Sequence, residues 1–496
     1  MSEAITRSAT TSPDLLTSLD PLLREWLPRQ RWFAGKGRPV TDFSLVAATE
    51  LLPITGQLGL YHLLVRAHQP ALHGPGDCYQ LLIGVREALP PRLAPALIGH
   101  VDRGPLNGRT VYDALYDARP AEVLLEAMRT RARIGSLRFD RDGGEGTAGG
   151  VGTAGGEGTA GGESRAGDGS GGEGEIPAGL VARMVTSEQS NSSIVYGDTF
   201  ILKLLRRVVP GVNPDLELPL ALAREGCPRV PAPVAWIRAD ATGTTAPDAE
   251  PDAEDSYVLG VLQPFVRGAA DGWELALREL AKGEDFSAEA RALGRATAEV
   301  HLALARALPT TTLGHAQLRP LVDGMIERLD AAIQAVPALH PYGPGLRSAY
   351  EALADLASEG QTWTAQRIHG DLHLGQCLRS PTGEWSLIDF EGEPSKPLAE
   401  RRLPQPPVRD IAGMLRSFDY AAHSLHPRSP DWAAACRAAY CAGYAEICGR
   451  DPRTDPVLLR AYETDKAVYE VVYEARHRPD WLPVPMSAIH RLSAPD

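Results

Sequence analysis

The chain lacks long apolar stretches. Although 43% of its residues are hydrophobic, no uninterrupted apolar run approaches the roughly 18 residues that a membrane-spanning helix requires. The first residues, MSEAITRSATTSPD, also lack the apolar core of a secretory signal. We therefore expect a cytoplasmic protein without a membrane partner.

Positive charge and cysteine are also scarce. The 496 residues carry a net charge of −13, which argues against a nucleic-acid partner because such a surface is broadly basic. The six cysteines are scattered without a CxxC pair, so neither a zinc site nor a disulfide framework is indicated. Arginine supplies nearly all of the positive charge, and the five lysines are Lys36, Lys203, Lys282, Lys396 and Lys466.

Glycine is concentrated in one low-complexity segment. Residues 143–175 repeat EGTAGG-like units, which cannot build an apolar core and predict a disordered insertion, bounded here at 136–177. A phosphate-binding loop is rejected at this position, because such a loop needs a strand before it and a helix after it.

The remaining segments differ in their periodicity. Residues 1–135 contain short apolar runs that predict a small sheet ending in a helix, and 178–268 predict a mainly β unit with one helix. Residues 269–496 are mostly helical by their apolar spacing. The expected fold class is α+β with two lobes, an arrangement that commonly holds a ligand between its lobes.

A lysine in a strand and an acid in a helix stand close together in the second segment. Lys203 lies in FILKLL, the second half of a hairpin predicted over 192–205, and Glu217 lies near the start of the next helix. Each has an ordinary explanation, since a lysine stem can cover a strand and an acid favours a helix N-terminus. Together they also suit a Lys–Glu pair that holds an ammonium against phosphate oxygens.

Two further stretches of this segment suit a nucleotide. SEQSNSS (187–193) could turn backbone N–H groups toward a phosphate. YVLGVLQPF (257–265) is a buried strand that ends in a link where adenine could bond to the backbone. The predicted nucleotide contacts beside Lys203 and Glu217 are Ser190, Asn191, Ser192, Gln263 and Phe265.

The stretch IHGDLHLGQCLRSPTGEWSLIDFEGEP, residues 368–394, carries the densest polar chemistry. In one interpretation, His369, Asp371 and His373 share a strand face and bind a metal, as in a hydrolase. In the other, Asp371 orients the hydroxyl of an attacking substrate, while Gln376 and Asp389 hold Mg²⁺ on nucleotide phosphates. Only the second interpretation also uses the lysine and glutamate upstream.

Several motifs in order carry a family resemblance: RQRWFAGKGR, ILKLL, HGDLHLGQ, IDFEGEP, RDIAGMLRSFDYAA and DKAVYEVVYEARHRPDW. The chain resembles the aminoglycoside-phosphotransferase-type, protein-kinase-like family and, more closely, the actinobacterial maltokinases. The resemblance implies a catalytic aspartate at Asp371, metal ligands at Gln376 and Asp389, and a phosphate-binding Lys203 with Glu217 as its partner. It also implies that residues 1–135 form an N-terminal β-rich cap domain.

The resemblance further implies an ATP- and Mg²⁺-dependent sugar kinase that is a monomer. Its expected reaction is maltose to maltose 1-phosphate, which feeds glycogen synthesis. The alternatives are glucosamine kinase, aminoglycoside kinase, a nucleotide-binding pseudokinase and, last, the hydrolase. His301 is expected to be a packing residue. The predicted sugar contacts are His373, Glu391, Arg409, Asp410, Glu470, Tyr473 and Trp481.

Overall fold

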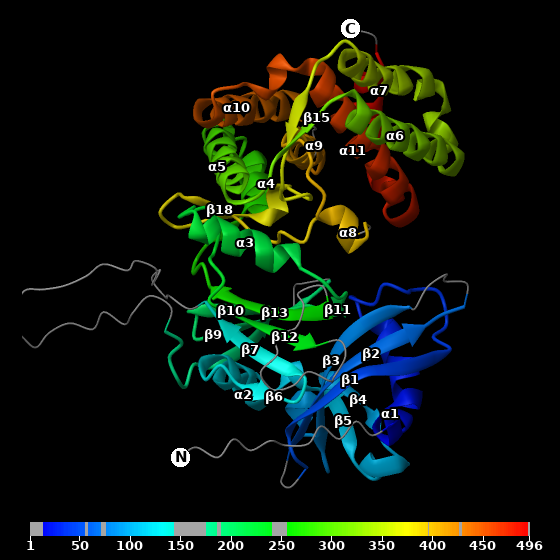
Figure 1. The fold of residues 1–496 in the computed structure, drawn as a ribbon, viewed down its shortest axis with the longest axis vertical. Coiled ribbons are helices and arrows are strands. Elements are labelled where there is room, and N and C mark those ends of the chain that lie inside the picture. The colour runs from blue at the N-terminus through cyan, green and yellow to red at the C-terminus, as the bar shows by residue number, and fades with distance from the viewer. Residues whose placement is uncertain are drawn as a thin grey trace, which may run out of the picture. The chain divides into compact units, whose positions relative to one another are not determined.

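A computed structural model describes residues 13–54, 58–70, 76–142, 175–185, 190–240, 255–394, 396–425 and 429–494 (Figure 1). The chain divides into two compact units. The first comprises Met1–Val212 and Pro233–Phe265, and the second comprises Asn213–Ala232 and Val266–Asp496.

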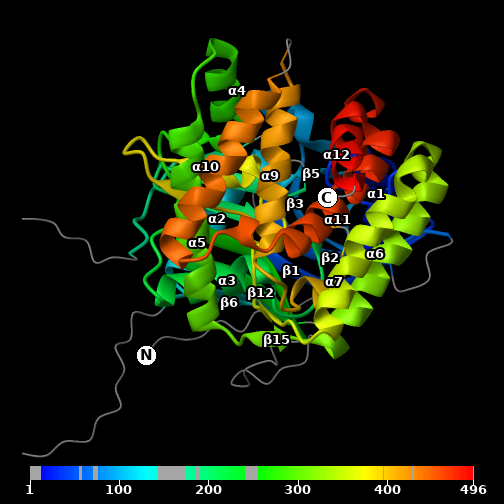
Figure 2. The same ribbon diagram turned by 90° about the horizontal axis from the view of Figure 1, so that it is seen from above.

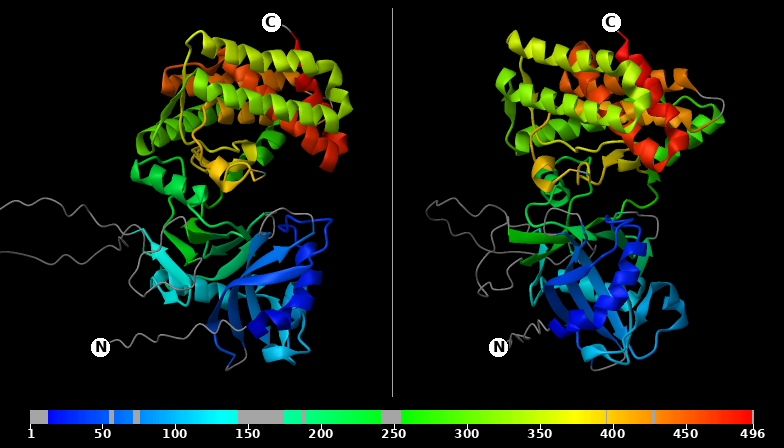
Figure 3. Two further views of the ribbon diagram at one scale, coloured as in Figure 1. Left: turned by 45° about the vertical axis from the view of Figure 1, so that its right-hand side comes forward. Right: turned by 90° about the vertical axis from the view of Figure 1, so that its right-hand side faces the viewer.

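The first unit begins with an antiparallel sheet covered by a helix. The strand order is β1-β2-β3-β5-β4, and β11 pairs with β3 beside β5. Helix α1 (Pro13–Trp26) lies against this sheet (Figure 3). Leu15, Leu19 and Leu23 recur on one face of the helix and join the buried core of the sheet. The strands are β1 (Asp42–Leu52), β2 (Gly59–His68), β3 (Asp77–Arg86), β4 (Leu97–His100), β5 (Thr110–Asp113) and β11 (Arg207–Val208).

A seven-stranded sheet completes the first unit, in the order β6-β7-β12-β13-β10-β9-β8. Helix α2 (Ala118–Arg129) belongs to the same unit, and the buried hydroxyl of Tyr196 donates to its Ala121 carbonyl at 2.9 Å. The strands are β6 (Arg133–Ile134), β7 (Leu137–Arg141), β8 (Ala182–Val185), β9 (Ser192–Tyr196), β10 (Phe200–Leu204), β12 (Ala235–Asp240) and β13 (Ser256–Pro264).

Two sequence predictions concern residues of this sheet. The hairpin is confirmed, because β9 and β10 pair in antiparallel register around Gly197 and Asp198, both with positive φ. The start of the insertion at residue 136 is wrong. Leu137 and Phe139 point into the core, and their segment forms strand β7, which pairs with β12. Within the remainder of the predicted insertion, residues 143–174 lie outside the described residues. Glu175–Pro177 are described.

The predicted boundary between residues 135 and 178 does not separate two compact bodies. Strand β11, which follows the hairpin, pairs with β3 of the first sheet, so both sheets belong to one unit. Helix α3 (Pro214–Arg224) belongs to the second unit instead, although the sequence groups it with the strands.

The second unit is mainly helical and has two apolar cores. Helices α5 and α10 lie side by side in the first core (Figures 1 and 2), where a Cβ on Gly294 would meet the Tyr440 carbonyl oxygen at 2.1 Å. The helices besides α3 are α4 (Gly272–Lys282), α5 (Ser287–Ala307), α6 (His315–Ala335), α7 (Gly343–Ser358), α8 (Leu398–Arg401), α9 (Val408–His423), α10 (Pro430–Cys448), α11 (Pro456–His477) and α12 (Pro483–Ser493).

Short strands interrupt these helices and place the polar stretch 368–394. The chain leaves β16 (Trp363–Ala365), which pairs with β15 (Thr311–Leu313), and reaches the hairpin β17–β18 through a polar loop. This hairpin (Cys377–Arg379 and Trp385–Leu387) pairs with β14 (Ala270–Asp271). Because the two hairpin strands are antiparallel, Gln376 before the first and Asp389 after the second come together.

None of the described helices is both long enough and apolar enough to cross a lipid bilayer.

Candidate active site

A buried carboxylate holds the loop that carries Asp371. Asp410, in the first turn of α9, is 1% exposed. Its two oxygens accept the backbone N–H groups of His369 and Gly370, each at 2.8 Å. Burial favours the protonated acid, but the bond from His301 Nε2 at 3.0 Å and the other donors hold the pKa of Asp410 below its usual value. The ionised side chain therefore fixes the loop backbone.

The sequence made predictions for His301 and Asp410. His301 is buried, as expected of a packing residue, and it also bridges Asp410 and the Tyr444 hydroxyl, which lies 3.0 Å from its Nδ1. The predicted sugar contact of Asp410 does not fit, because its oxygens are committed to the loop and its side chain is buried.

Asp371 forms an ion pair with a lysine from the C-terminal part of the unit. The Nζ atom of Lys466, on α11, lies 3.1 Å from Asp371 Oδ1. Burial alone would raise the pKa of Asp371, but Lys466 and His373 outweigh burial and lower it. The same pair raises the pKa of Lys466 against the effect of burial. Both groups are therefore charged at neutral pH.

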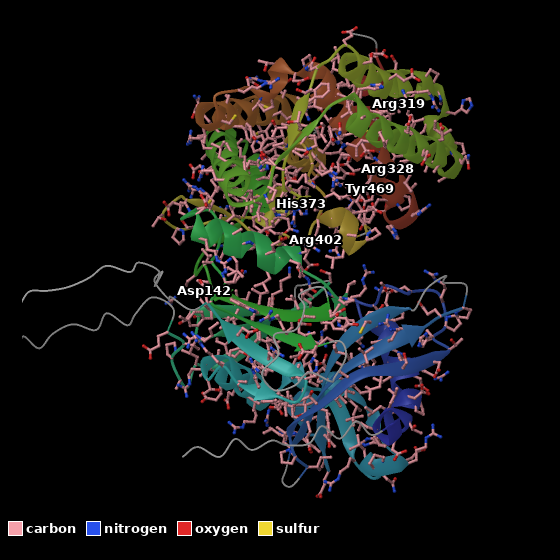
Figure 4. The ribbon with its side chains drawn as sticks, viewed as in Figure 1. Asp142, Arg319, Arg328, His373, Arg402 and Tyr469 are labelled. Atoms are coloured by element: carbon pink, nitrogen blue, oxygen red, sulfur yellow. The ribbon has the colours of Figure 1, made fainter. Side chains whose placement is uncertain are left out.

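A pocket surrounds this ion pair, with walls from α6, α9, α11 and the Asp371 loop. Figure 4 labels Arg328 of α6 and Tyr469 of α11, two of its lining residues. The lining contains four carboxylates and four permanent cations, so its formal charge is zero. They are Asp371, Glu393, Asp410 and Asp465 on one side, and Arg328, Lys396, Arg409 and Lys466 on the other.

Each of these carboxylates already has a positively charged or N–H partner. Glu393 lies 2.9 Å from Arg409 and 3.8 Å from Lys396. Asp465 lies 2.9 Å from Arg328. Arg409, a predicted sugar contact, lines the same pocket as Asp371.

The predicted metal ligands are brought together. The amide Nε2 of Gln376 donates to Asp389 Oδ2 at 2.9 Å. Asp389 has a φ of 66°, which is unusual for a residue other than glycine and is typical of functional sites. Carboxylate oxygens of Asp215, Asp389 and Glu391 also lie within 4.8 Å of one another, an oxygen-rich arrangement that suits a hard cation such as Mg²⁺.

Asp215 was missed as a member of this cluster. It lies in the first turn of α3, which Asn213 caps by accepting the Asp215 N–H at 2.8 Å. The Asp215 carboxylate instead accepts the Phe390 N–H at 2.7 Å. Because these residues are 175 positions apart in the chain, no local pattern indicates the contact. Glu391, predicted to bind sugar, lies in the same cluster.

The two histidines do not form the alternative metal site. His369 Nε2 donates to the Ile388 carbonyl at 2.9 Å, and His373 Nδ1 accepts the Gly375 N–H at 3.1 Å. Burial lowers the pKa of His373, although Asp371 opposes the shift. Within the described ranges, the residues arranged to hold an ion include neither histidine, so the geometry gives no support to a hydrolase.

Comparisons with known proteins agree with this geometry. Residues 26–117 match the maltokinase N-terminal cap domain. A glucosamine kinase of Streptacidiphilus jiangxiensis is 31% identical over 330 residues, which are 61% of this chain and 71% of that protein. This chain belongs to the aminoglycoside-phosphotransferase-type family of ATP-dependent sugar kinases.

Other relatives of the kinase extend this result. A glucosamine kinase of Mycolicibacterium smegmatis is 29% identical over 338 residues, covering 62% of this chain and 79% of that protein. A solved structure of a glucosamine kinase in complex with glucosamine, ADP and inorganic phosphate has a TM-score of 0.60 at 22% identity, over 95% of this chain and 98% of that one. The predicted two-lobed fold with an N-terminal cap is confirmed.

The predicted pair of Lys203 and Glu217 spans the two units of the kinase. Glu217 belongs to the second unit, where its carboxylate lies 2.7 Å from Arg367, just before the Asp371 loop. Lys203 belongs to the first unit, in strand β10 opposite Ser193 and Val261. The pairing of Lys203 with Glu217 therefore stays a prediction, and Arg367 is a partner that the sequence did not indicate.

The predicted nucleotide residues of the first unit gather around the β9–β10 hairpin. Asn191 and Ser192 are buried at the start of β9. Gln263 pairs with Ile201 of β10. The Phe265 N–H already donates to the Thr199 carbonyl at 2.9 Å, so only its carbonyl is left for the predicted adenine contact. Ser190 is exposed.

The predicted sugar face of α11 divides into buried and exposed parts. Glu470 is 8% exposed, and its carboxylate bonds to Arg416 at 2.9 Å, so the predicted sugar contact of Glu470 does not fit. Tyr473 is 41% exposed and stacks on Tyr469, which lines the pocket. Trp481 stacks on Tyr420 with 6.1 Å between ring centroids. Sugar stacking on Tyr473 and Trp481 remains a prediction.

Proposed function

We propose that this kinase phosphorylates the anomeric hydroxyl of maltose and forms maltose 1-phosphate for α-glucan synthesis. The observation that carries the proposal is the ion pair of Asp371 and Lys466 inside a pocket of zero formal charge. The matched maltokinase cap domain over residues 26–117 supports the same acceptor.

Asp371 supplies the acid–base chemistry in this proposal. The acceptor hydroxyl donates a hydrogen bond to its carboxylate, attacks the γ-phosphorus of ATP, and releases ADP while its proton passes to Asp371. A carboxylate whose pKa is lowered is a weak base, which suits a loose transition state in which proton transfer comes late. Its main contribution is therefore to align the hydroxyl.

Gln376 and Asp389 would hold Mg²⁺, with oxygens of Asp215 and Glu391 beside them. The donor set fits the ion because it consists of carboxylate and amide oxygens. When bound, Mg²⁺ supplies positive charge that offsets the charge of the phosphate oxygens. Lys203 and the run 190–192 are proposed to contact the phosphates in the first unit.

The choice of maltose rests on the charges around the pocket. A sugar ammonium would meet Lys466 beside Asp371, and Lys396, Arg409 and Arg328 elsewhere in the lining. Since each lining carboxylate already has a partner, an ammonium would have to displace one of these cations. A neutral sugar needs only hydrogen bonds and apolar contact, for which the Tyr469 ring is available.

Glucosamine is the second candidate acceptor. It is favoured by the glucosamine kinases that are 31% and 29% identical to this chain. At neutral pH part of the glucosamine population is uncharged, and that form would avoid the cations of the pocket.

Measurement of ADP release with ATP, Mg²⁺ and one acceptor at a time separates these proposals. We expect kcat/KM for maltose to exceed that for glucosamine or kanamycin by at least about tenfold, or about 1.4 kcal/mol. Strong turnover of glucosamine with background turnover of maltose would establish the second candidate. No ADP release with any sugar, despite ATP binding, would indicate a pseudokinase.

A further inference from the structure

A buried ion pair joins the cap domain to the hairpin of the second sheet, within the first unit. Arg206 follows β10 and is 2% exposed. Its Nη2 donates to Asp113 Oδ2 at 2.7 Å, and the Asp113 side chain is 4% exposed. Asp113 ends strand β5, inside the segment that matches the cap domain.

The same arginine also reaches the run that is proposed to face the phosphates. Its Nε donates to Ser192 Oγ at 2.8 Å. Its backbone N–H donates to Asn191 Oδ1 at 3.4 Å. Arg206 thus bonds to the cap through one end of its guanidinium and to two residues of the run through Nε and its backbone.

The cap contributes more than the carboxylate. The Arg206 guanidinium lies over the Trp32 ring, 4.8 Å from its centroid. Trp32 belongs to the RQRWFAGKGR motif, to which no catalytic role is assigned, and packs against Tyr79. The Gln80 N–H donates to the Arg206 carbonyl at 2.8 Å. Cap residues therefore surround both the side chain and the backbone of Arg206.

The free-energy cost of burying a charge explains why the contacts of Arg206 constrain residues 191–192. A guanidinium buried away from water is stable only where an opposite charge and hydrogen-bond acceptors surround it. Loss of the Asp113 charge would leave Arg206 buried without compensation, and the side chain would move toward water. Ser192 would then lose the bond from Arg206 Nε, and the backbone N–H that bonds Asn191 Oδ1 would no longer be anchored by the Arg206 side chain.

We propose that the cap positions the phosphate-binding run through Arg206, with Asp113 and Trp32 as its partners. All three are positioning residues, since they act through Asn191 and Ser192. The inference rests on the proposed function of residues 190–192 as phosphate contacts. In this proposal, the cap stabilises the conformation of the site that binds the triphosphate.

Asp113→Asn has a closely matched control in Asp117→Asn. Asp117 Oδ2 also lies 2.7 Å from an arginine, Arg86. Each aspartate caps the helix that follows it, through the N–H of Leu115 or Arg119. Asparagine keeps a capping oxygen in both variants. Asp113→Asn removes the charged partner of Arg206, which contacts the phosphate-binding run. Asp117→Asn removes the charged partner of Arg86 instead.

The readouts are binding of ATP and of adenosine to the full-length kinase, together with KM for each substrate. We expect Asp113→Asn to weaken ATP binding at least tenfold, with adenosine binding and the sugar KM changed less than twofold. Trp32→Leu is expected to act in the same direction by severalfold. Arg206→Lys should retain more ATP affinity than Arg206→Met, since it keeps the charge. Asp117→Asn should leave ATP binding unchanged.

Equal ATP binding by the two asparagine variants would overturn the inference, as would an equal loss of ATP and adenosine binding by Asp113→Asn. If Asp113→Asn does not fold, Trp32→Leu carries the same test, because it removes a ring contact and leaves the charges in place. The proposed function fails separately if Lys203→Met and Ser192→Ala both bind ATP like the unmodified kinase. In that case neither the Lys203 ammonium nor the Ser192 hydroxyl contributes to phosphate binding.

Discussion

Two loops of this kinase are held by buried aspartates in different ways. In the second unit, Asp410 accepts two backbone N–H groups of the Asp371 loop directly. In the first unit, Asp113 reaches Ser192 through the side chain of Arg206. Direct bonding fixes backbone atoms, as an aligned nucleophile requires. The relay through an arginine links the segment that matches the cap domain to residues 191–192, which are proposed to contact phosphates.

The largest effect is expected from Asp371→Asn, which tests whether the directly held loop performs the chemistry. The amide cannot accept the hydroxyl proton, so kcat should fall about a thousandfold or more, while ATP affinity stays within about threefold. Single-turnover phosphoryl transfer and ATP titration measure the two effects. Retained turnover would contradict the role of Asp371.

Asp410→Asn tests the direct bonding itself. An amide nitrogen would face a backbone N–H that needs an acceptor, and the loop would shift. We expect kcat to fall about a hundredfold with little change in ATP affinity. A change in ATP affinity without a change in kcat would show that the loop held by Asp410 acts on binding. It would contradict the proposed difference between this loop and the one held through Arg206.

The same variant has a defined pH signature. The pKa of Asp410 is lowered in the folded protein. Its stabilising contribution is therefore present above the unfolded-state pKa of about 3.9 and is lost as pH falls through the folded value. The difference in unfolding free energy between the two proteins should be constant near pH 7 and should shrink below about pH 4. Urea unfolding at a series of pH values measures it.

Gly413→Ala tests the backbone contact behind the same loop. A Cβ at this position of α9 would lie 2.6 Å from the Leu372 carbonyl oxygen, next to Asp371. We expect kcat to fall about tenfold because small displacements of a catalytic group are costly.

Gly324→Ala is the matched control for this change. Gly324 also lies inside a helix, and a Cβ there would meet Arg328 at 3.5 Å, an ordinary contact. We expect unchanged kcat and a gain in stability of about 0.5–1 kcal/mol from helix propensity. Equal kinetic effects of both substitutions would show that the loop contact is irrelevant.

The smallest effect is expected from Lys466→Met, which removes the cation beside Asp371. Since Lys466 helps to lower the pKa of that carboxyl, its loss should raise the pKa of Asp371. The acidic limb of the kcat/KM profile for maltose should move to higher pH, while kcat near pH 8 changes only severalfold. An unmoved limb would show that this lysine acts only on binding.

The sequence alone indicated the order of the segments, because apolar periodicity is local. The hairpin followed from two apolar runs around Gly197 and Asp198. The residues Asp371, Gln376 and Asp389 followed from their types, spacing and family resemblance, and the hairpin of β17 and β18 brings the latter two together. The end of strand β7 at residue 141 did not follow, since a short strand is defined by its partner β12.

Only the tertiary structure decided which charges meet. Lys466 and Asp371 are 95 positions apart, and His301 and Asp410 are 109 apart. Glu217 bonds to Arg367 within the second unit, although the sequence suggested only Lys203 as its partner. Helix packing sets these long-range contacts through the shape of the apolar cores. The sequence thus determined which chemical groups the kinase carries, and packing decided which of them line the pocket and which hold the loops.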